Sequence, residues 1–137
     1  MALLKKDDFW GISRQMPAEA VEVHDSTGKV VGEIHMRGLS GRELTEYQNS
    51  LTIMLSSGQM KPNTRHAMAK LVALCAINED GSPYFDKHEI GQLDDAPARI
   101  IIPLFESAQR LCGLTDEDFK EMTEGFGETE TEVSASS

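Results

Sequence analysis

The sequence predicts a mainly α fold with an N-terminal β-hairpin, an α+β chain with a compact body of about five short helices and a disordered acidic tail. Apolar residues alternate with polar ones on both sides of the turn at residues 25–28, which is typical of a hairpin. Beyond Ser40 the apolar residues recur at helical spacing. From Gly125 the chain is low in complexity, acidic and poor in apolar residues, which favours disorder.

The predicted hairpin spans residues 19–37. With Ser26 and Thr27 at the tip, Val23 faces Val30 across the two strands. This register gathers one apolar face, made of Val21, Val23, Val30, Ile34 and Met36. A two-stranded ribbon is marginally stable alone, so helices or a partner must cover that face.

A first helix is predicted to begin at Ser40, because Ser40 and Glu43 form a capping box. Its apolar positions continue to Leu55, and residues 56–58 end it. Pro62 suits the first turn of a second helix, where a missing amide is tolerated. The broad apolar face of this second helix comprises Met68, Leu71, Val72, Leu74 and Cys75.

Residues 78–83 form a predicted turn, after which Tyr84 and Phe85 are expected to fold back onto the core. Asp86 then caps a short helix that ends near Leu93.

The next predicted helix, residues 97–112, is apolar on more than one face and includes three consecutive isoleucines at 100–102. Pro103 is expected to kink this helix or to divide it in two. This helix is predicted to begin at a cap formed by Asp94 or Asp95 and to end at Gly113. Thr115 is predicted to cap a last short helix, whose apolar contacts are Phe119 and Met122.

These elements suggest three parts: an N-terminal arm at 1–18, one domain at 19–124 (hairpin 19–37, helical body 40–124), and the disordered tail at 125–137. Phe9 and Trp10 leave two interpretations of the arm open. It is either a loose segment, or an anchor whose aromatic rings dock on the body or on a neighbouring subunit.

The composition argues against several functions. The net charge is −10, and residues 113–137 carry eight acidic groups and one basic group, so nucleic-acid binding is not expected. The start of the chain does not resemble a signal peptide, and no apolar run approaches the roughly 20 residues of a membrane helix. Both cysteines, Cys75 and Cys112, lie in apolar helical patterns and are predicted to be buried free thiols.

Catalytic and metal chemistry is also not expected, so we predict no cofactor and no enzyme activity. The hairpin histidines, His24 and His35, are predicted to lie roughly 20 Å apart. The acidic turn at 78–89 cannot be a calcium loop, because placing Gly81 at the sixth position puts Ala76 first and Lys87 twelfth. No phosphate-loop pattern surrounds Lys29.

The order of elements resembles that of the tail assembly chaperones of long-tailed (siphovirus-type) phages, over residues 20–124. The segments that carry the resemblance are MRGLSGREL (36–44), a Leu/Ala-rich helix ending at Ala76-Ile77-Asn78, EDGSPYF (79–85), HEIGQL (88–93), the helix at 97–112 and the exit Gly113-Leu114-Thr115. The resemblance implies an accessory protein of the host cytoplasm that is absent from the mature virion. It also implies binding to the helical tape measure protein, and to tail-tube protein through a longer, frameshifted form.

A protein that binds helical clients needs apolar grooves. Helix 97–112 is more apolar than one small subunit can bury, so its surplus face is expected to mediate client binding or self-association. The candidate residues are Leu44, Tyr47, Leu51, Met54, Ile101, Leu104, Phe105 and Leu111. Two other hypotheses remain: a structural head–tail joining or tail component of the virion, and a small regulator that dimerises through its helices.

Overall fold

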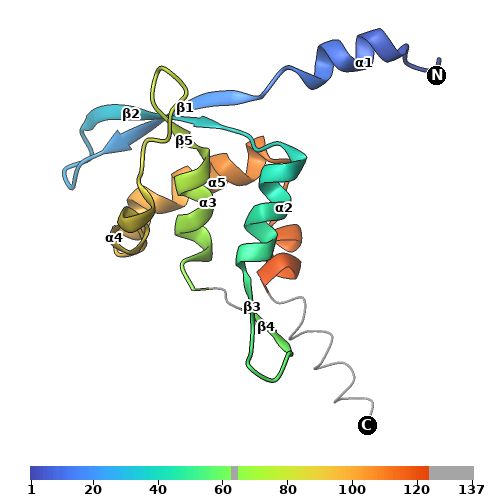
Figure 1. Cartoon of the computed structure of the whole chain (residues 1–137). Coiled ribbons are helices and arrows are strands. Elements are labelled where there is room, and N and C mark those ends of the chain that lie inside the picture. Colours follow the sequence, from blue (N-terminus) through green and yellow to red (C-terminus); the bar gives the residue numbers. More distant parts are fainter. Residues whose placement is uncertain (63–64, 124–137) are drawn as a thin grey trace.

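The computed structural model describes residues 1–62 and 65–123 and confirms the predicted α+β class (Figure 1). The predicted disordered tail lies outside the described residues. The elements are α1 (Lys6–Ser13), β1 (Ala18–His24), β2 (Val30–Arg37), α2 (Gly41–Ser50), β3 (Thr52–Met54), β4 (Met60–Pro62), α3 (Ala67–Cys75), β5 (Ala76–Ile77), the 3₁₀ turn η1 (Lys87–Glu89), α4 (Ile90–Asp94) and α5 (Ala98–Leu111), followed by a helical segment at 116–123.

The hairpin of β1 and β2 forms as predicted, but its register differs by two residues. Val23 lies opposite Gly32 rather than Val30, and a bulge between Val23 and His24 pairs Val30 with His24. A shift of two residues preserves which side chains share a face, because strand side chains alternate with a period of two. The predicted inner face therefore survives except for Val30, which the bulge leaves exposed.

A third strand was not predicted. The helix that was expected to continue through Ile77 ends at Cys75, and Ala76 takes an extended conformation. In the described part of the chain, β5 pairs antiparallel with β2, placing Ala76 opposite Met36, so the sheet order is β1-β2-β5. The edge of β2 thereby gains backbone partners that one more turn of α3 would not provide.

The region after Ser50 also differs from the prediction. The Ser40–Glu43 capping box is present, but α2 ends at Ser50, and the predicted continuation to Leu55 is wrong. Strands β3 and β4 form a small separate hairpin there, with Gly58 in the left-handed region at φ 89°. Pro62 therefore belongs to a strand, and the second helix begins only at Ala67. The β-branched pair Thr52-Ile53 suits a strand better than a helix end.

Helix α5 is one continuous helix, so the predicted division at Pro103 is wrong. Its N-cap is Pro97 rather than Asp94 or Asp95. Pro103 is the sixth residue of α5, so its missing amide removes one helical hydrogen bond, to Arg99, near the helix start. The side chain of Arg99 makes separate contacts: its guanidinium donates to the carbonyl oxygens of His24 and Asp25, at 3.0 and 3.1 Å, and ties α5 to the hairpin turn.

The end of α5 confirms the predicted C-cap. Gly113 has a φ of 73°, its amide donates to Arg110, and the amide of Leu114 donates to Gln109, which is a Schellman motif. Thr115 and Asp118 then cap the last helical segment reciprocally, each backbone amide donating to the other side chain at 3.0 Å.

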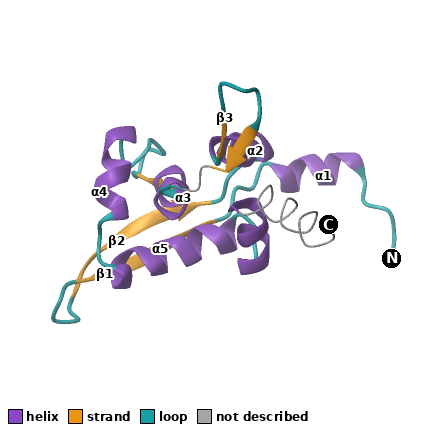
Figure 2. Cartoon of the chain, turned by 90° about the horizontal axis from the view of Figure 1, so that it is seen from below, coloured by secondary structure: helices purple, strands orange, loops and turns teal. Residues whose placement is uncertain are grey.

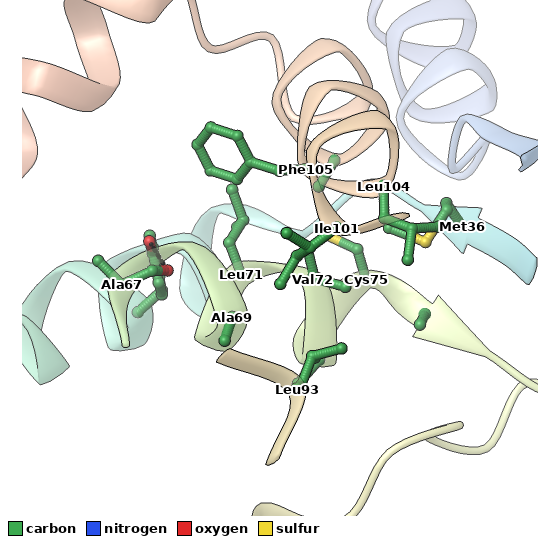
Figure 3. Close-up of a cluster of buried hydrophobic side chains, with 14 of the residues drawn as sticks. Met36, Ala67, Ala69, Leu71, Val72, Cys75, Leu93, Ile101, Leu104 and Phe105 are labelled. Atoms are coloured by element: carbon green, nitrogen blue, oxygen red, sulfur yellow. Dashed lines mark hydrogen bonds between the residues drawn. The ribbon is translucent and has the colours of Figure 1, made fainter. Parts of the chain in front are cut away.

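The core lies between α3, α5 and the sheet. Figure 2 shows α5 running along the β1–β2 hairpin, and Figure 3 shows the side chains of α3 and α5 packed together. Phe119 joins this core through an edge-to-face contact with Phe105, with ring centroids 4.7 Å apart. The core residues labelled in Figure 3 are Met36, Ala67, Ala69, Leu71, Val72, Cys75, Leu93, Ile101, Leu104 and Phe105.

The two cysteines are free, as predicted, with Cys75 buried and Cys112 half-buried. Their sulfur atoms are 3.9 Å apart. A hydrogen bond from the Cys75 thiol lowers the pKa of Cys112 to about 7, while the same bond and burial raise the pKa of Cys75.

The segment after the turn at 78–83 packs only in part. Asp86 and Glu89 form the expected cap, in which the Asp86 amide donates to the Glu89 carboxylate at 2.8 Å. Phe85 is half-buried against the core, as expected. Tyr84 does not fold back but remains exposed.

Candidate client-binding groove

An apolar groove opens between α2, α3 and the segment that leads through η1 into α4. Its volume is about 570 Å³. The floor is formed by Tyr47, Ala73, Leu74, Pro83, Phe85 and Ile90. The rim carries charges of both signs, from Arg37, Glu43, Glu46, Lys70, Asp86 and Lys87, together with Ser50. An apolar floor with a mixed charged rim can bind apolar side chains that are flanked by polar ones.

Two hydrogen bonds hold the walls of the groove together. The buried hydroxyl of Tyr47 on α2 donates to the carbonyl oxygen of Ala67 at the start of α3, at 2.6 Å. The ammonium of Lys70 on α3 donates to the carbonyl oxygen of Ser50 at the end of α2, at 3.3 Å. Burial raises the pKa of Tyr47, so its hydroxyl stays protonated as a donor. Helices α2 and α3 therefore stand side by side with a fixed spacing (Figure 1).

One end of the groove holds a rigid ion pair. The guanidinium of Arg37 donates to both carboxylate oxygens of Glu43, at 2.9 and 2.7 Å, and Glu43 also accepts from the Ser40 amide. The hydrogen bonds from Arg37 and Ser40 lower the pKa of Glu43 to about 2, so this carboxylate is ionised at neutral pH.

Across residues 1–62 and 65–123, no group of three or more His, Cys, Asp and Glu side chains is arranged to hold a metal ion. Three histidines each lie near one carboxylate: His66 is 2.8 Å from Asp94, His35 is 3.2 Å from Glu33, and His88 is 3.8 Å from Asp86. In the same residue ranges, none of the helices has the length and apolarity needed to cross a membrane.

The predicted site residues fall in three places. The side chains of five pack inside the subunit, and Leu44 and Leu111 are half-buried. Met54 is exposed on β3, apart from the others. The five buried residues are Tyr47, Leu51, Ile101, Leu104 and Phe105. Of all eight, Tyr47 is the one that lines the groove. Whether the others contact a client stays a prediction.

The three isoleucines at 100–102 do not share one environment. Ile101 is buried, Ile100 is half-buried, and Ile102 is 41% exposed. The subunit therefore covers most, but not all, of the apolar surface of α5.

Three groove residues were not predicted from the sequence: Leu74, Phe85 and Ile90. Leu74 was expected in the core, but it is 41% exposed, because α3 turns this side of its apolar face towards the groove. The sequence signal for this exposure was the width of the apolar face of the helix. Five apolar positions within eight residues make a wider face than one packed side of a helix can bury.

The solved structure of the bacteriophage HK97 tail assembly chaperone is similar to this chain. The identity is 16%, the match covers 77% of this chain and 98% of that chain, and the TM-score is 0.47. The similarity concerns the fold alone. No protein-family model and no curated protein matches the sequence.

Proposed function

We propose that this protein is a phage tail assembly chaperone that binds an amphipathic helix of the tape measure protein in the groove between α2 and α3. The groove with its partly exposed Leu74 is the observation that carries the proposal. The residue pattern at 36–44, 79–85, 88–93 and 113–115 supports the class of client.

The groove matches the requirements of a client helix. Apolar residues recur at i, i+3, i+4 and i+7 along one side of an amphipathic helix, and such a stripe needs a long apolar floor. Tyr47, Leu74 and Ile90 come from three different helices and together provide much of that floor. The polar edges of the client then meet a rim with three acidic and three basic side chains.

Binding by this groove explains why an apolar side chain is left in contact with water. Covering Leu74 and its neighbours with the apolar stripe of a client removes hydrocarbon surface from water at about 25 cal/mol per Å². The same contact shields the client stripe, which is the surface that would otherwise aggregate. A chaperone of this kind acts by covering an apolar surface of its client and does not need to make or break covalent bonds.

The proposal is tested by co-expression with the tape measure protein. The wild-type chain should raise the soluble yield of that protein and co-purify with it. Leu74→Glu should abolish both effects, because it places a charge on the groove floor while leaving the core intact.

Ile102→Glu is the matched control, since Ile102 is also a helical residue with 41% exposure but lies outside the groove. This variant should behave like the wild type. If the wild type gives no rise in soluble yield, or if Leu74→Glu binds as well as Ile102→Glu, the proposal is wrong.

The proposal also places the protein in the host cytoplasm during assembly rather than in the finished particle. Mass spectrometry of purified virions should therefore not detect it. Detection at the stoichiometry of tail proteins would favour the structural alternative. Recruitment of tail-tube protein through a longer, frameshifted form remains a prediction of the sequence resemblance.

A further inference from the structure

The two cysteines of the sequence lie side by side in the fold, although they are 37 positions apart in the chain. Cys75 is the last residue of α3, and Cys112 is the C-cap of α5. Their sulfur atoms are 3.9 Å apart and share a hydrogen bond. A disulfide bond is roughly 2.05 Å long, so the sulfurs need to approach by about 2 Å to form one. The proposed client binding uses neither thiol.

The two thiols differ in their contact with solvent. Cys75 has no exposed surface and lies among the core side chains of Figure 3, whereas Cys112 is half-buried. Of the two residues only Cys112 touches water, so a small oxidant meets Cys112 first. A partly exposed thiol with a second, shielded thiol beside it is the arrangement found in redox-sensing cysteines.

The connection from β2 to α2 lies against the end of α5. A Cβ atom on Gly38 would be 2.6 Å from the carbonyl oxygen of Leu111, so a side chain at this position would prevent the approach. The two neighbours of Gly38 are thereby brought close to Cys112, and both Arg37 and Leu39 act on its ionisation.

The groups around Cys112 favour its thiolate, which is the form that reacts with oxidants. The hydrogen bond from the Cys75 thiol is the main cause that lowers the pKa of Cys112 to about 7. The Leu39 backbone and the charge of Arg37 act in the same direction, whereas burial and the Glu43 carboxylate oppose them. The same hydrogen bond and burial raise the pKa of Cys75, so Cys75 keeps its proton while Cys112 reacts.

We propose that Cys75 and Cys112 form a redox-active pair that a hydroperoxide converts to an intramolecular disulfide. The Cys112 thiolate attacks one oxygen of hydrogen peroxide, the O–O bond breaks, and the departing hydroxide takes up the proton that Cys112 released. The sulfenic acid formed at Cys112 is then attacked by the Cys75 sulfur. The S–S bond forms, the S–O bond breaks, and the hydroxyl leaves as water with the Cys75 proton. The two sulfurs together lose two electrons, which reduce one peroxide to two water molecules.

The disulfide joins the end of α3 to the end of α5 and closes the loop between them. A cross-link of this kind restricts the unfolded chain, so the melting temperature of the oxidised protein should rise by several degrees. In a reducing compartment the pair stays as two thiols and changes state only while peroxide is present. The inference needs no client and stands independently of the proposed function.

The test uses the fully reduced chain and hydrogen peroxide at a concentration that oxidises free glutathione in the same buffer. The intact mass should fall by the mass of two hydrogen atoms. Peptide mapping without reductant should find the peptide that contains Cys75 linked to the one that contains Cys112. Dithiothreitol should restore the original mass and the original melting temperature.

Two serine variants test the order of the two steps. Cys75→Ser keeps a hydroxyl donor beside Cys112 but removes the second sulfur, so the sulfenic acid at Cys112 should persist and be trapped by dimedone. Cys112→Ser leaves only the shielded thiol, so dimedone labelling at Cys75 should be absent. Circular dichroism melting checks that both variants remain folded, and the wild-type cross-link provides the main result without any substitution.

Several results would overturn the proposal. Two intact thiols after peroxide treatment indicate that the pair is buried and unreactive. A cross-link between two chains on a non-reducing gel indicates that the bond does not close within one subunit. Oxidation of single sulfurs without a link from Cys75 to Cys112 indicates that the sulfurs cannot approach. Dimedone labelling of Cys75 in Cys112→Ser contradicts the order of attack, and a melting temperature that does not rise on oxidation contradicts the stabilising cross-link.

Discussion

Helices α5 and α1 carry similar kinds of apolar residues but have opposite environments. Helix α5 buries Ile101, Leu104, Phe105 and Ala108 against α3 and the sheet (Figure 3). Helix α1 carries Phe9, Trp10 and Ile12, and none of these is buried by the described chain. The difference shows that apolar content alone does not indicate which helix belongs to the core and which one stays outside it.

The physical reason is the number of surfaces that each helix can reach. Helix α5 follows β1, β2 and α3 in the chain and packs against all three. Helix α1 precedes a strand whose start is fixed at Gly38, so the chain carries it outward. Helix α2 is intermediate, since it is held to α3 by Tyr47 and Lys70 but leaves the groove open beside it.

The largest effect is expected in α5. Ile101→Asp buries a charge without a partner and should cost about 4 kcal/mol or more, which is enough to unfold a domain of this size. The neighbouring Ile102→Asp should cost no more than about 1 kcal/mol, because the side chain is already partly in water. Chemical denaturation of both variants measures the contrast. Equal stability of the two would contradict the packing described for α5.

A medium effect is expected where α2 meets α3. Tyr47→Phe keeps the ring but removes the donor to the Ala67 carbonyl oxygen, and should cost about 1–2 kcal/mol. Thermal or denaturant melting gives the value. Leu44→Ala serves as a comparison on the same helix, because it removes apolar contact without touching that hydrogen bond. A Tyr47→Phe variant as stable as the wild type would show that water replaces the lost partner.

The smallest effect on stability is expected in α1. Phe9→Asp should leave the melting temperature of the dilute protein unchanged, because no described residue of α1 is buried. A clear fall in melting temperature under dilute conditions would mean that the arm packs on its own subunit, and would remove the contrast between α1 and α5.

Local signals in the sequence located several helix caps, although they misplaced the end of α2 and both ends of α3. Ser40 and Glu43, Asp86 and Glu89, and Gly113 each lie where the structure has the corresponding cap. A cap depends on residues three or four positions apart, so it can be recognised without knowledge of the fold.

Pairing between distant segments was not recognisable in the same way. The two-residue strand β5 exists because the edge of β2 lies next to Ala76. The β3–β4 hairpin replaces a helical extension that looked acceptable from its apolar spacing. The register of the first hairpin was misplaced by two residues, since the bulge after Val23 leaves no clear pattern in the sequence.

The fold class, several of the caps and most of the inner face of the first hairpin followed from residues near one another in the sequence, because short-range geometry governs them. The groove did not follow from them. It combines Tyr47 from α2, Leu74 from α3 and Ile90 from α4. Those residues become neighbours only in the folded chain. There α2, α3 and α5 compete for the same limited apolar surface, and as a result Leu74 stays in contact with water whereas Ile101 does not.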